Sequence, residues 1–310
     1  MRVVARLALA LCLVHLVLAN RVRLPSDHRD EKIDDDDVKL LAQESIGYFR
    51  ERKLFDENGR SDAEWIEQIS QSPRAYVYRG FLSDAECDHV ISRAYGTMTR
   101  SLVVDEERGG DKEDGGRTSM GGWVTSHEDE VIRDIELRVS TWAMLPRNRG
   151  ETMQVMRYEA GQQYEAHDDF FHDELNIRNG GQRVATVLMY LSDVEEGGET
   201  VFPLGTPLGG QSPDKSGVAE ENACKLAAKG DPRVVAVKPR RGDALLFFNA
   251  HLNGEMDVNS KHAGCPVLRG TKWTMTRWHR VGAIDVGTFA WDPRDDQESR
   301  PPVTAPVDSA

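Results

Sequence analysis

Short runs of β-branched, aromatic and aliphatic residues dominate the chain between residues 150 and 280. Gly, Pro and Asp separate these runs, so each of them predicts a β-strand and not part of a long helix. Many short strands at this spacing are typical of a β-sandwich or a jelly roll. The predicted strands are residues 153–158, 183–191, 199–202, 233–237, 244–248 and 272–278.

Two amphipathic helices are predicted before these strands. Ser83 and Glu86 form a capping box that opens the first helix. Its apolar face carries Cys87, Val90, Ile91 and Ala94. The second helix is predicted to open at residues 126–129, and its apolar face carries Val131, Ile135, Val139 and Trp142. The pattern therefore predicts an α+β fold with a jelly-roll core and with the helices packed against one sheet.

The N-terminus has the pattern of a targeting segment. Arg2 and Arg6 precede a nearly apolar run over residues 7–19. A run this short, with basic residues before it, predicts a secretory signal peptide, with a retained signal anchor as the alternative. Either interpretation places the rest of the protein in the lumen of the endoplasmic reticulum or Golgi. The anchor would add membrane attachment through the N-terminus.

The region after residue 19 divides into three parts by composition. Residues 20–62 are polar and acidic and predict a stem or linker. Residues 291–310 are rich in Pro, Asp and Ser and predict a disordered tail. The folded domain is therefore expected over residues 63–290. A chain of 310 residues that is 39% hydrophobic can bury one sizeable core.

The charge balance narrows the class of partners. The chain carries 52 acidic and 39 basic residues, with a net charge of −13. Lys and Arg are scattered and form no basic stripe, so nucleic acid is not expected as a partner. An acidic surface suits a neutral or basic polypeptide substrate.

Cysteine usage agrees with an oxidising compartment. Cys12 lies inside the targeting segment, which leaves Cys87, Cys224 and Cys265. Three cysteines allow at most one internal bridge. We predict a disulfide between Cys224 and Cys265, and a buried thiol at Cys87 on its amphipathic helix. No CxxC pair is present, which argues against a structural zinc site.

One short motif offers metal ligands within a single strand-like segment. His167 and Asp169 form a His-x-Asp pair. Asp168 competes with Asp169, but alternation places Asp169 on the same side as His167 if the segment is extended. Two imidazoles and one carboxylate are the ligand set of non-haem Fe(II) oxygenases.

The second imidazole has two candidates later in the chain. His251 follows the apolar strand 244–248, and His262 precedes Lys272 by ten residues. His262 is favoured because one hairpin could aim it and Lys272 into one cavity. A buried cation such as Lys272 can hold the distal carboxylate of a dicarboxylic co-substrate.

Two Gly-rich and charged insertions interrupt the strands. They span residues 105–116 and 204–217. Loops of this kind beside a site often act as lids, whereas the alternative is a simple surface insertion. The first insertion leads into a polar trio, residues 117–119, just before Trp123.

Several motifs together resemble the prolyl 4-hydroxylases, with the closest likeness to their plant and algal branch. The resemblance covers about residues 65–280. PRAY at 73–76 and GFL at 80–82 resemble the start of that catalytic domain. The remaining motifs are QVMRY at 154–158, QYEAHDD at 163–169, GGET at 197–200, GDAL at 242–245, GCPV at 264–267 and GTKW at 270–273.

The resemblance implies a double-stranded β-helix that binds Fe(II) and the co-substrate 2-oxoglutarate. His167, Asp169 and His262 would ligate the iron. Lys272 would pair with the C5 carboxylate of 2-oxoglutarate, with Tyr158 and Thr200 as hydrogen-bonding neighbours. Such enzymes use O₂ to hydroxylate C4 of peptidyl proline while 2-oxoglutarate becomes succinate and CO₂, and they use ascorbate to restore oxidised iron.

The resemblance also implies contacts with a Pro-rich polypeptide in the polyproline II conformation. Tyr164, Arg183 and His279 match substrate-contacting positions. The family usually places a residue between the Trp and the His, whereas Trp278 and His279 are adjacent here. In a strand such a shift turns the side chain to the other face. The alternatives are a 2-oxoglutarate oxygenase with another substrate and a catalytically silent Pro-rich-peptide binding module.

Overall fold

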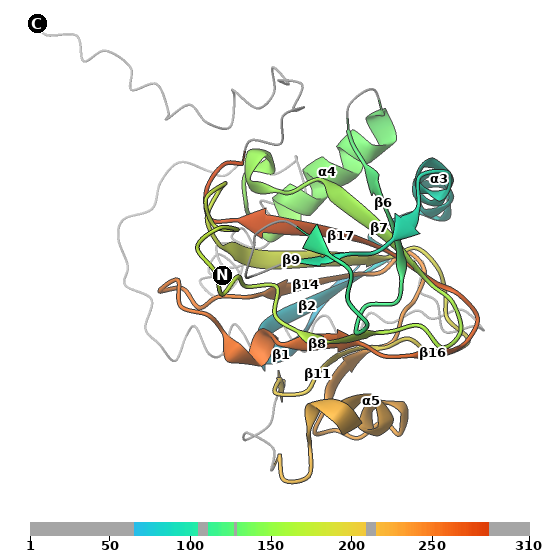
Figure 1. Ribbon diagram of the computed structural model, residues 1–310, viewed down its shortest axis with the longest axis vertical. Helices are drawn as coiled ribbons and strands as arrows, with labels where there is room; N and C mark the ends of the chain where they lie inside the picture. The colour runs from blue at the N-terminus through green and yellow to red at the C-terminus, as the bar shows by residue number, and fades with distance from the viewer. Residues whose placement is uncertain (1–64, 105–110, 127–128, 209–214, 285–310) are drawn as a thin grey trace, which may run out of the picture. The chain divides into compact units, whose positions relative to one another are not determined.

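Two antiparallel β-sheets form the core of the protein in this computed structural model (Figure 1). The structure describes residues 65–104, 111–126, 129–208 and 215–284. The predicted signal segment, the stem and the tail lie outside these residues. The chain divides into the units Met1–Glu67 and Gln68–Ala310, and the fold described here is that of the second unit.

The larger sheet has nine strands in the described residues. It contains the strands predicted over residues 153–158, 183–191, 244–248 and 272–278, together with strands at the start of the domain that the sequence pattern did not reveal. In spatial order the strands are β12 (Thr206–Pro207), β1 (Trp65–Ser72), β2 (Arg74–Arg79), β14 (Ala244–Phe248), β9 (Arg183–Tyr190), β17 (Lys272–Arg280), β7 (Met153–Tyr158), β6 (Met120–Val124) and β3 (Thr99–Arg100).

The smaller sheet has four strands in the same part of the chain. In spatial order they are β13 (Val235–Val237), β11 (Thr200–Phe202), β15 (His262–Gly264) and β8 (Tyr164–His167). Two short ribbons complete the strand set: β10 (Glu196–Gly197) with β16 (Val267–Arg269), and β4 (Val103–Val104) with β5 (Asp111–Lys112).

Apolar side chains from both sheets meet between them. The rings of Phe202 in β11 and Phe247 in β14 are fully buried and lie 5.1 Å apart, edge to face. Leu245 and Tyr190 join the same cluster from the larger sheet, and Val235 joins it from the smaller. Each fully buried side chain of this size contributes about 1.5–3 kcal/mol to folding. The predicted jelly-roll core is thereby confirmed.

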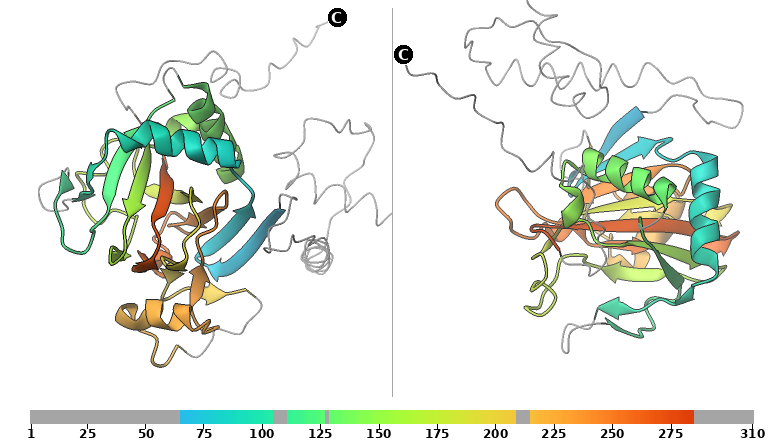
Figure 2. Two further views of the ribbon diagram at one scale, coloured as in Figure 1. Left: turned by 90° about the vertical axis from the view of Figure 1, so that its right-hand side faces the viewer. Right: turned by 90° about the horizontal axis from the view of Figure 1, so that it is seen from above.

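Two helices cover the outer face of the larger sheet (Figures 1 and 2). Helix α3 (Asp84–Tyr95) begins at Ser83 with the predicted capping box to Glu86. Helix α4 (Glu130–Ala143) begins later than the sequence predicts, because Asp129 accepts from the Ile132 amide and serves as its N-cap. Figure 2 shows both helices on the side opposite the smaller sheet.

A third helix was not predicted and packs elsewhere. Helix α5 (Glu220–Ala228) contacts β11 of the smaller sheet, which places it on the opposite side from α3 and α4 (Figure 1). Two short 3-10 helices, η1 (Arg147–Arg149) and η2 (Val258–Ser260), also lie between the strands. None of the described helices has the length and apolarity needed to cross a membrane.

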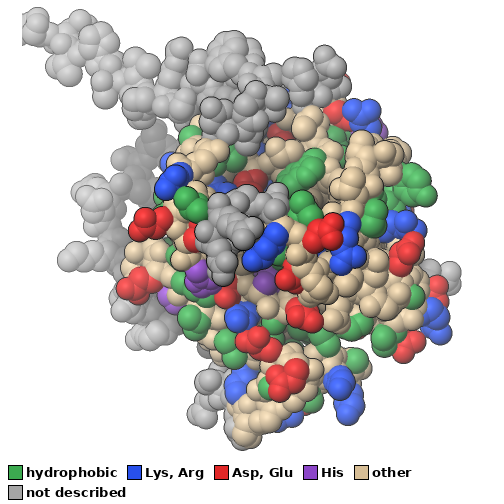
Figure 3. All heavy atoms as spheres, in the orientation of Figure 1, with side chains coloured by type: hydrophobic (Ala, Val, Ile, Leu, Met, Phe, Trp, Pro, Cys, Tyr) green, Lys and Arg blue, Asp and Glu red, His purple; other side chains and the backbone are tan. Residues whose placement is uncertain are grey.

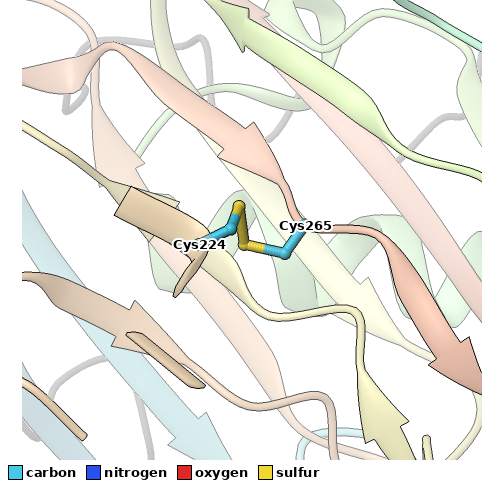
Figure 4. Close-up of a disulfide and its surroundings, with 2 residues drawn as sticks. All are labelled: Cys224 and Cys265. Atoms are coloured by element: carbon cyan, nitrogen blue, oxygen red, sulfur yellow. A yellow bond between two sulfur atoms is a disulfide. The ribbon is translucent and has the colours of Figure 1, made fainter. Parts of the chain in front are cut away.

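The predicted disulfide is present. Cys224 of α5 is bonded to Cys265, which follows β15 directly (Figure 4). The bridge fastens α5 to the smaller sheet over a small apolar cluster that includes Val201 and Ala263. Cys87 is a buried free thiol, as predicted, and burial raises its pKa to about 11.

Candidate active site

Three side chains that can ligate a metal come together in the smaller sheet. Strands β8 and β15 are antiparallel neighbours, and their register places His262 directly opposite His167. The two imidazole rings lie 4.3 Å apart between centroids. The carboxylate of Asp169 lies 3.8 Å from Nε2 of His167 and 3.8 Å from Nε2 of His262. One ligand atom from each residue therefore lies within 4.8 Å of the others.

Backbone carbonyls fix the orientation of both imidazoles. Nδ1 of His167 donates to the Glu165 carbonyl at 2.8 Å, and Nδ1 of His262 donates to the Ser260 carbonyl at 2.9 Å. Nε2 of each ring therefore faces Asp169. Burial, followed by the neighbouring His262, lowers the pKa of His167 to about 3. Burial alone would raise the pKa of Asp169, but His262, His167, Arg183 and the hydrogen bond from Thr186 together hold this pKa below its usual value.

This arrangement fits a divalent transition metal. Neutral imidazoles and an ionised carboxylate are the protonation states in which these side chains bind metals. Two histidines and one carboxylate with further positions open form the facial triad of non-haem Fe(II) sites. The competing residues lie outside the cluster: Asp168 approaches Lys261 at 3.9 Å, and His251 approaches Asp257 at 3.9 Å.

A buried lysine lies in a small inner cavity that shares His167, Asp169 and His262 with this cluster. Lys272 is 3% exposed, and no ion pair of its ammonium is found in the described part of the chain. Burial lowers its pKa to about 8, against the opposing effect of Glu199. A buried cation without a counter-ion is unfavourable. The cavity is therefore suited to a ligand that brings a carboxylate.

Aromatic rings and hydroxyl groups surround this ammonium. Nζ of Lys272 lies 5.5 Å from the centroid of the Tyr158 ring and 6.0 Å from that of Tyr190. The Tyr190 hydroxyl donates to Oγ1 of Thr200 at 2.9 Å. The cavity measures about 50 Å³, and the hydroxyls of Thr274 and Thr276 on its wall are buried without a protein partner. These groups can bind the oxygens of a small polar ligand.

A larger outer cleft of about 540 Å³ opens from the same cluster. Arg117, Tyr164, His167, Asp169 and Trp278 line both the cleft and the inner cavity. The Tyr164 ring stacks on the His167 ring with 3.7 Å between centroids. The Arg117 guanidinium lies 4.8 Å from the centroid of the same Tyr164 ring. An aromatic wall therefore borders the metal-ligating cluster.

Arg183 lies on another wall of the cleft and is held rigidly. Its Nε and Nη2 each donate to Glu151 at 2.7 Å. Its guanidinium lies 4.2 Å from the Trp278 ring centroid and 4.7 Å from that of Phe171. A planar guanidinium held between two rings and one carboxylate loses little further freedom when it binds a ligand.

The described part of the first insertion reaches this cleft, and that of the second does not. Lys112, Asp114 and Gly116 line the outer cleft. The amide of Glu165 donates to the Gly116 carbonyl at 2.9 Å, which docks the end of this insertion on β8. No described residue of 204–217 lines either cavity.

Comparisons with known proteins point to the same chemistry. The model of the 2OG-Fe(II) oxygenase superfamily matches residues 153–280. "Probable prolyl 4-hydroxylase 4" of Arabidopsis thaliana is 46% identical over 222 residues, which cover 71% of this chain and 72% of the relative. "Prolyl 4-hydroxylase 2" of the same plant is 46% identical over 220 residues, with 71% of each chain covered. The chain belongs to the prolyl 4-hydroxylase family.

One solved structure is similar to this hydroxylase over most of its domain. It is the viral collagen prolyl hydroxylase of Paramecium Bursaria Chlorella virus-1 in its 2OG complex, with 26% identity and a TM-score of 0.44. The match covers 71% of this chain and 97% of that chain. The superfamily match begins at the start of β7 and ends with β17, so it contains both strands of the cluster and Lys272.

The structure places His279, for which the resemblance implies a substrate contact, outside both cavities. Lys272 and Trp278 of β17 line the inner cavity. Side chains alternate between the two faces of a strand, so His279, next to Trp278, projects from the opposite face. His279 is fully buried, and among the described residues neither of its ring nitrogens has a hydrogen-bond partner. It lies on the face of β17 that carries Arg277, which bonds to the Glu136 carbonyl of α4. Trp278, on the opposite face of β17, lines both cavities.

Two site residues of the hydroxylase had no assigned role in the sequence. Arg117 belongs to the polar trio after the first insertion, which was the available signal, and it donates to the Leu102 carbonyl and to Gln154. Thr186 donates to Asp169 at 2.7 Å from the middle of β9, where no local pattern distinguishes it from a structural residue.

Proposed function

We propose that this enzyme hydroxylates C4 of proline residues in Pro-rich polypeptides. In the same reaction 2-oxoglutarate is oxidatively decarboxylated to succinate and CO₂. The observation that carries the proposal is the buried Lys272, which has no ion pair among the described residues and lines one cavity with His167, Asp169 and His262. These features together accommodate iron and a dicarboxylate in one cavity. The names of the relatives supply the peptidyl-proline substrate class.

The inner cavity binds 2-oxoglutarate by its C5 carboxylate. Lys272 pairs with the C5 carboxylate, which supplies the missing counter-ion and offsets the cost of burying the ammonium. Tyr158 and Thr200 act as hydrogen-bonding neighbours of this carboxylate, and both line the cavity. Because this end of the cavity is buried, a second charged ligand is excluded once the co-substrate is in place.

His167, Asp169 and His262 would hold Fe(II). When bound, the iron activates O₂ for the coupled oxidation of 2-oxoglutarate and of the substrate C–H bond. The protein keeps these ligands in their binding states. The Glu165 and Ser260 carbonyls fix the tautomers of the imidazoles, and a hydrogen bond holds the carboxylate in place.

The outer cleft takes the Pro-rich polypeptide in a polyproline II conformation. Tyr164 and Trp278 offer aromatic faces to proline rings, which is how Pro-rich chains bind in aromatic-lined grooves. Glu151 accepts from Nε and Nη2 of Arg183, so Nη1 is the group left to donate to a peptide carbonyl. These contacts orient one proline toward the cluster.

The compartment and the reductant are part of the same proposal. The apolar run over residues 7–19 directs the chain to the endoplasmic reticulum or Golgi lumen, as a soluble enzyme or on a retained anchor. The disulfide between Cys224 and Cys265 supports an oxidising compartment. Ascorbate restores iron that is oxidised in turnovers not coupled to hydroxylation.

The test is 2-oxoglutarate turnover with and without peptide. Purified protein with Fe(II), 2-oxoglutarate and ascorbate should release succinate slowly, and a Pro-rich peptide should stimulate this release. His167→Ala should abolish the stimulated rate. If a free amino acid or a Lys-rich peptide stimulated succinate release and no Pro-rich peptide did, the enzyme would act on another class of substrate.

A further inference from the structure

The floor of the outer cleft is the inner face of the larger sheet. Thr276 of β17 pairs with Gln154 of β7, which in turn pairs with Trp123 of β6. Paired residues of adjacent strands project from the same face. Thr276 lines the inner cavity, whereas Gln154 and Trp123 line the outer cleft. One row of side chains therefore runs from the inner cavity across the floor of the outer cleft to Trp123 of β6.

Trp123 ends this row, and its indole is exposed. It is 52% exposed, whereas Trp142, Trp273 and Trp278 are each less than a tenth exposed. Across the described residues its indole N–H has no hydrogen-bond partner and its ring contacts no other aromatic ring or cation. Leu102, 39% exposed, lines the same cleft. The Trp123 indole therefore presents an exposed apolar face to a ligand that lies in the outer cleft.

We propose that Trp123 forms a distal subsite, which binds a proline ring of the substrate chain remote from the proline that reacts. This proposal rests on the proposed function, since it adds a second recognition point for the same polypeptide. Indole faces bind proline rings in aromatic-lined grooves, and the polyproline II chain is already ordered before it binds.

The spacing of the strands gives the position of this second proline. Thr186 of β9 donates to Asp169, so β9 marks the position of the metal-ligating cluster, where the reacting proline would lie. Strand β9 lies three strand spacings from β6, in the order β9-β17-β7-β6. Neighbouring strands are about 4.8 Å apart, so these spacings amount to about 14 Å. Polyproline II advances about 3.1 Å per residue. The ring on Trp123 therefore lies about four or five residues from the reacting proline.

Peptides of different lengths test the subsite. One peptide carries a single reactive proline with about two residues on each side; the others extend it by about five residues of Pro-rich or Gly-Ser sequence on one side. A Pro-rich extension on one of the two sides should raise kcat/KM of the wild-type enzyme by about tenfold, because one well-placed tryptophan contact contributes this much to binding. The Gly-Ser extension should give no such gain.

Two variants at the same position and one control complete the test. Trp123→Ala should remove the gain from the Pro-rich extension, and Trp123→Phe should retain part of it. Leu252→Ala should keep the whole gain, because Leu252 is 92% exposed and lines neither cavity. An undiminished gain in Trp123→Ala would overturn the proposal.

Binding measured by fluorescence anisotropy of a labelled, extended peptide separates this proposal from the proposed function. Binding that weakens about tenfold in Trp123→Ala, without hydroxylation by the wild type, would support the subsite and contradict the hydroxylase activity. Hydroxylation by the wild type, with equal peptide binding by the wild type and Trp123→Ala, would support the hydroxylase activity and contradict the subsite.

Discussion

Thr186 donates a hydrogen bond of 2.7 Å to Oδ2 of Asp169, and its hydroxyl oxygen accepts one of 3.0 Å from Nδ2 of Asn249. Thr186 is 2% exposed, and Asn249 is fully buried. The two bonds form a chain that holds the carboxylate of the metal-ligating cluster in one orientation. Partners of this kind orient the ligand and tune its basicity.

Replacing Thr186 should therefore weaken metal binding. In Thr186→Val the carboxylate of Asp169 loses its buried donor, and the affinity for Co(II) or Fe(II) should fall by about 10–100-fold. Thr186→Ser keeps the hydroxyl and should stay close to the wild type. Isothermal titration of the metal-free protein measures the affinity. Thr141→Val, on the exposed side of α4, is the matched control, and a Thr186→Val affinity equal to that of the control would contradict this role.

The binding of 2-oxoglutarate should depend on the charge of Lys272. Its pKa of about 8 in the unliganded site lies well below the ordinary value of 10.5, because burial disfavours the ammonium. The protonated form pairs with the carboxylate, so the dissociation constant should rise above pH 8, by up to about tenfold per pH unit. Titration of 2-oxoglutarate into the metal-loaded protein without O₂, between pH 7 and 10, measures this.

Lys272→Arg and Lys272→Met are the controls for the pH dependence. The guanidinium stays charged over the whole range. Lys272→Arg should therefore bind 2-oxoglutarate more weakly, because it is larger, but without the loss above pH 8. Lys272→Met should bind poorly at every pH. A wild-type affinity for 2-oxoglutarate that stays constant up to pH 10 would show that Lys272 does not lose its proton in this pH range.

The disulfide should stabilise the domain through α5 and the smaller sheet. Cys224 and Cys265 are 41 residues apart, and closing a loop of this length contributes roughly 4 kcal/mol in the chain-entropy model. A reductant should therefore lower the free energy of unfolding of the wild type by an amount of this order. Urea denaturation with and without the reductant measures it. The Cys224→Ser/Cys265→Ser variant should start lower and be insensitive to the reductant.

His279 should make the fold sensitive to acid. Burial, followed by the neighbouring Arg277, lowers its pKa from 6.5 to about 3. The unfolded chain binds a proton below pH 6.5, whereas the folded protein does not until about pH 3, so stability falls as the pH drops through this window. Between pH 7 and 5 this residue alone should cost roughly 2 kcal/mol.

The variant that tests this is His279→Leu. Urea unfolding of the wild type and of the variant at pH 7 and pH 5 should show a smaller acid loss in the variant. The variant should also leave the KM for a Pro-rich peptide close to the wild-type value, because His279 lies on the far face of β17 from the cleft. A large rise of this KM would restore the substrate contact that the sequence suggested.

Local patterns in the sequence predicted the parts of the site that depend on alternation within one strand. His167 and Asp169 are two residues apart, and an even spacing in an extended segment places both on one side. The same rule applies to β17, where Lys272 and Trp278 are six residues apart. This even spacing places both side chains on the face of β17 that lines the inner cavity, and His279 on the opposite face.

Other parts of the site arise only from long-range pairing. Thr186 meets Asn249 because β9 and β14 are antiparallel neighbours, with Thr186 opposite Phe247. No periodicity in either segment indicates that contact. Helix α5 is nine residues long and lies among Gly-rich loops, so its apolar positions are too few to form a recognisable stripe.

The most direct measurement is the fate of molecular oxygen. A Pro-rich peptide should be incubated with the enzyme, Fe(II), 2-oxoglutarate and ascorbate under ¹⁸O₂, and both products should be analysed by mass spectrometry. We expect one labelled oxygen on a peptidyl proline, placed at C4 by fragmentation and nuclear magnetic resonance, and one in succinate, in equal amounts. Labelled succinate without any labelled proline, in every Pro-rich peptide tried, would contradict the account.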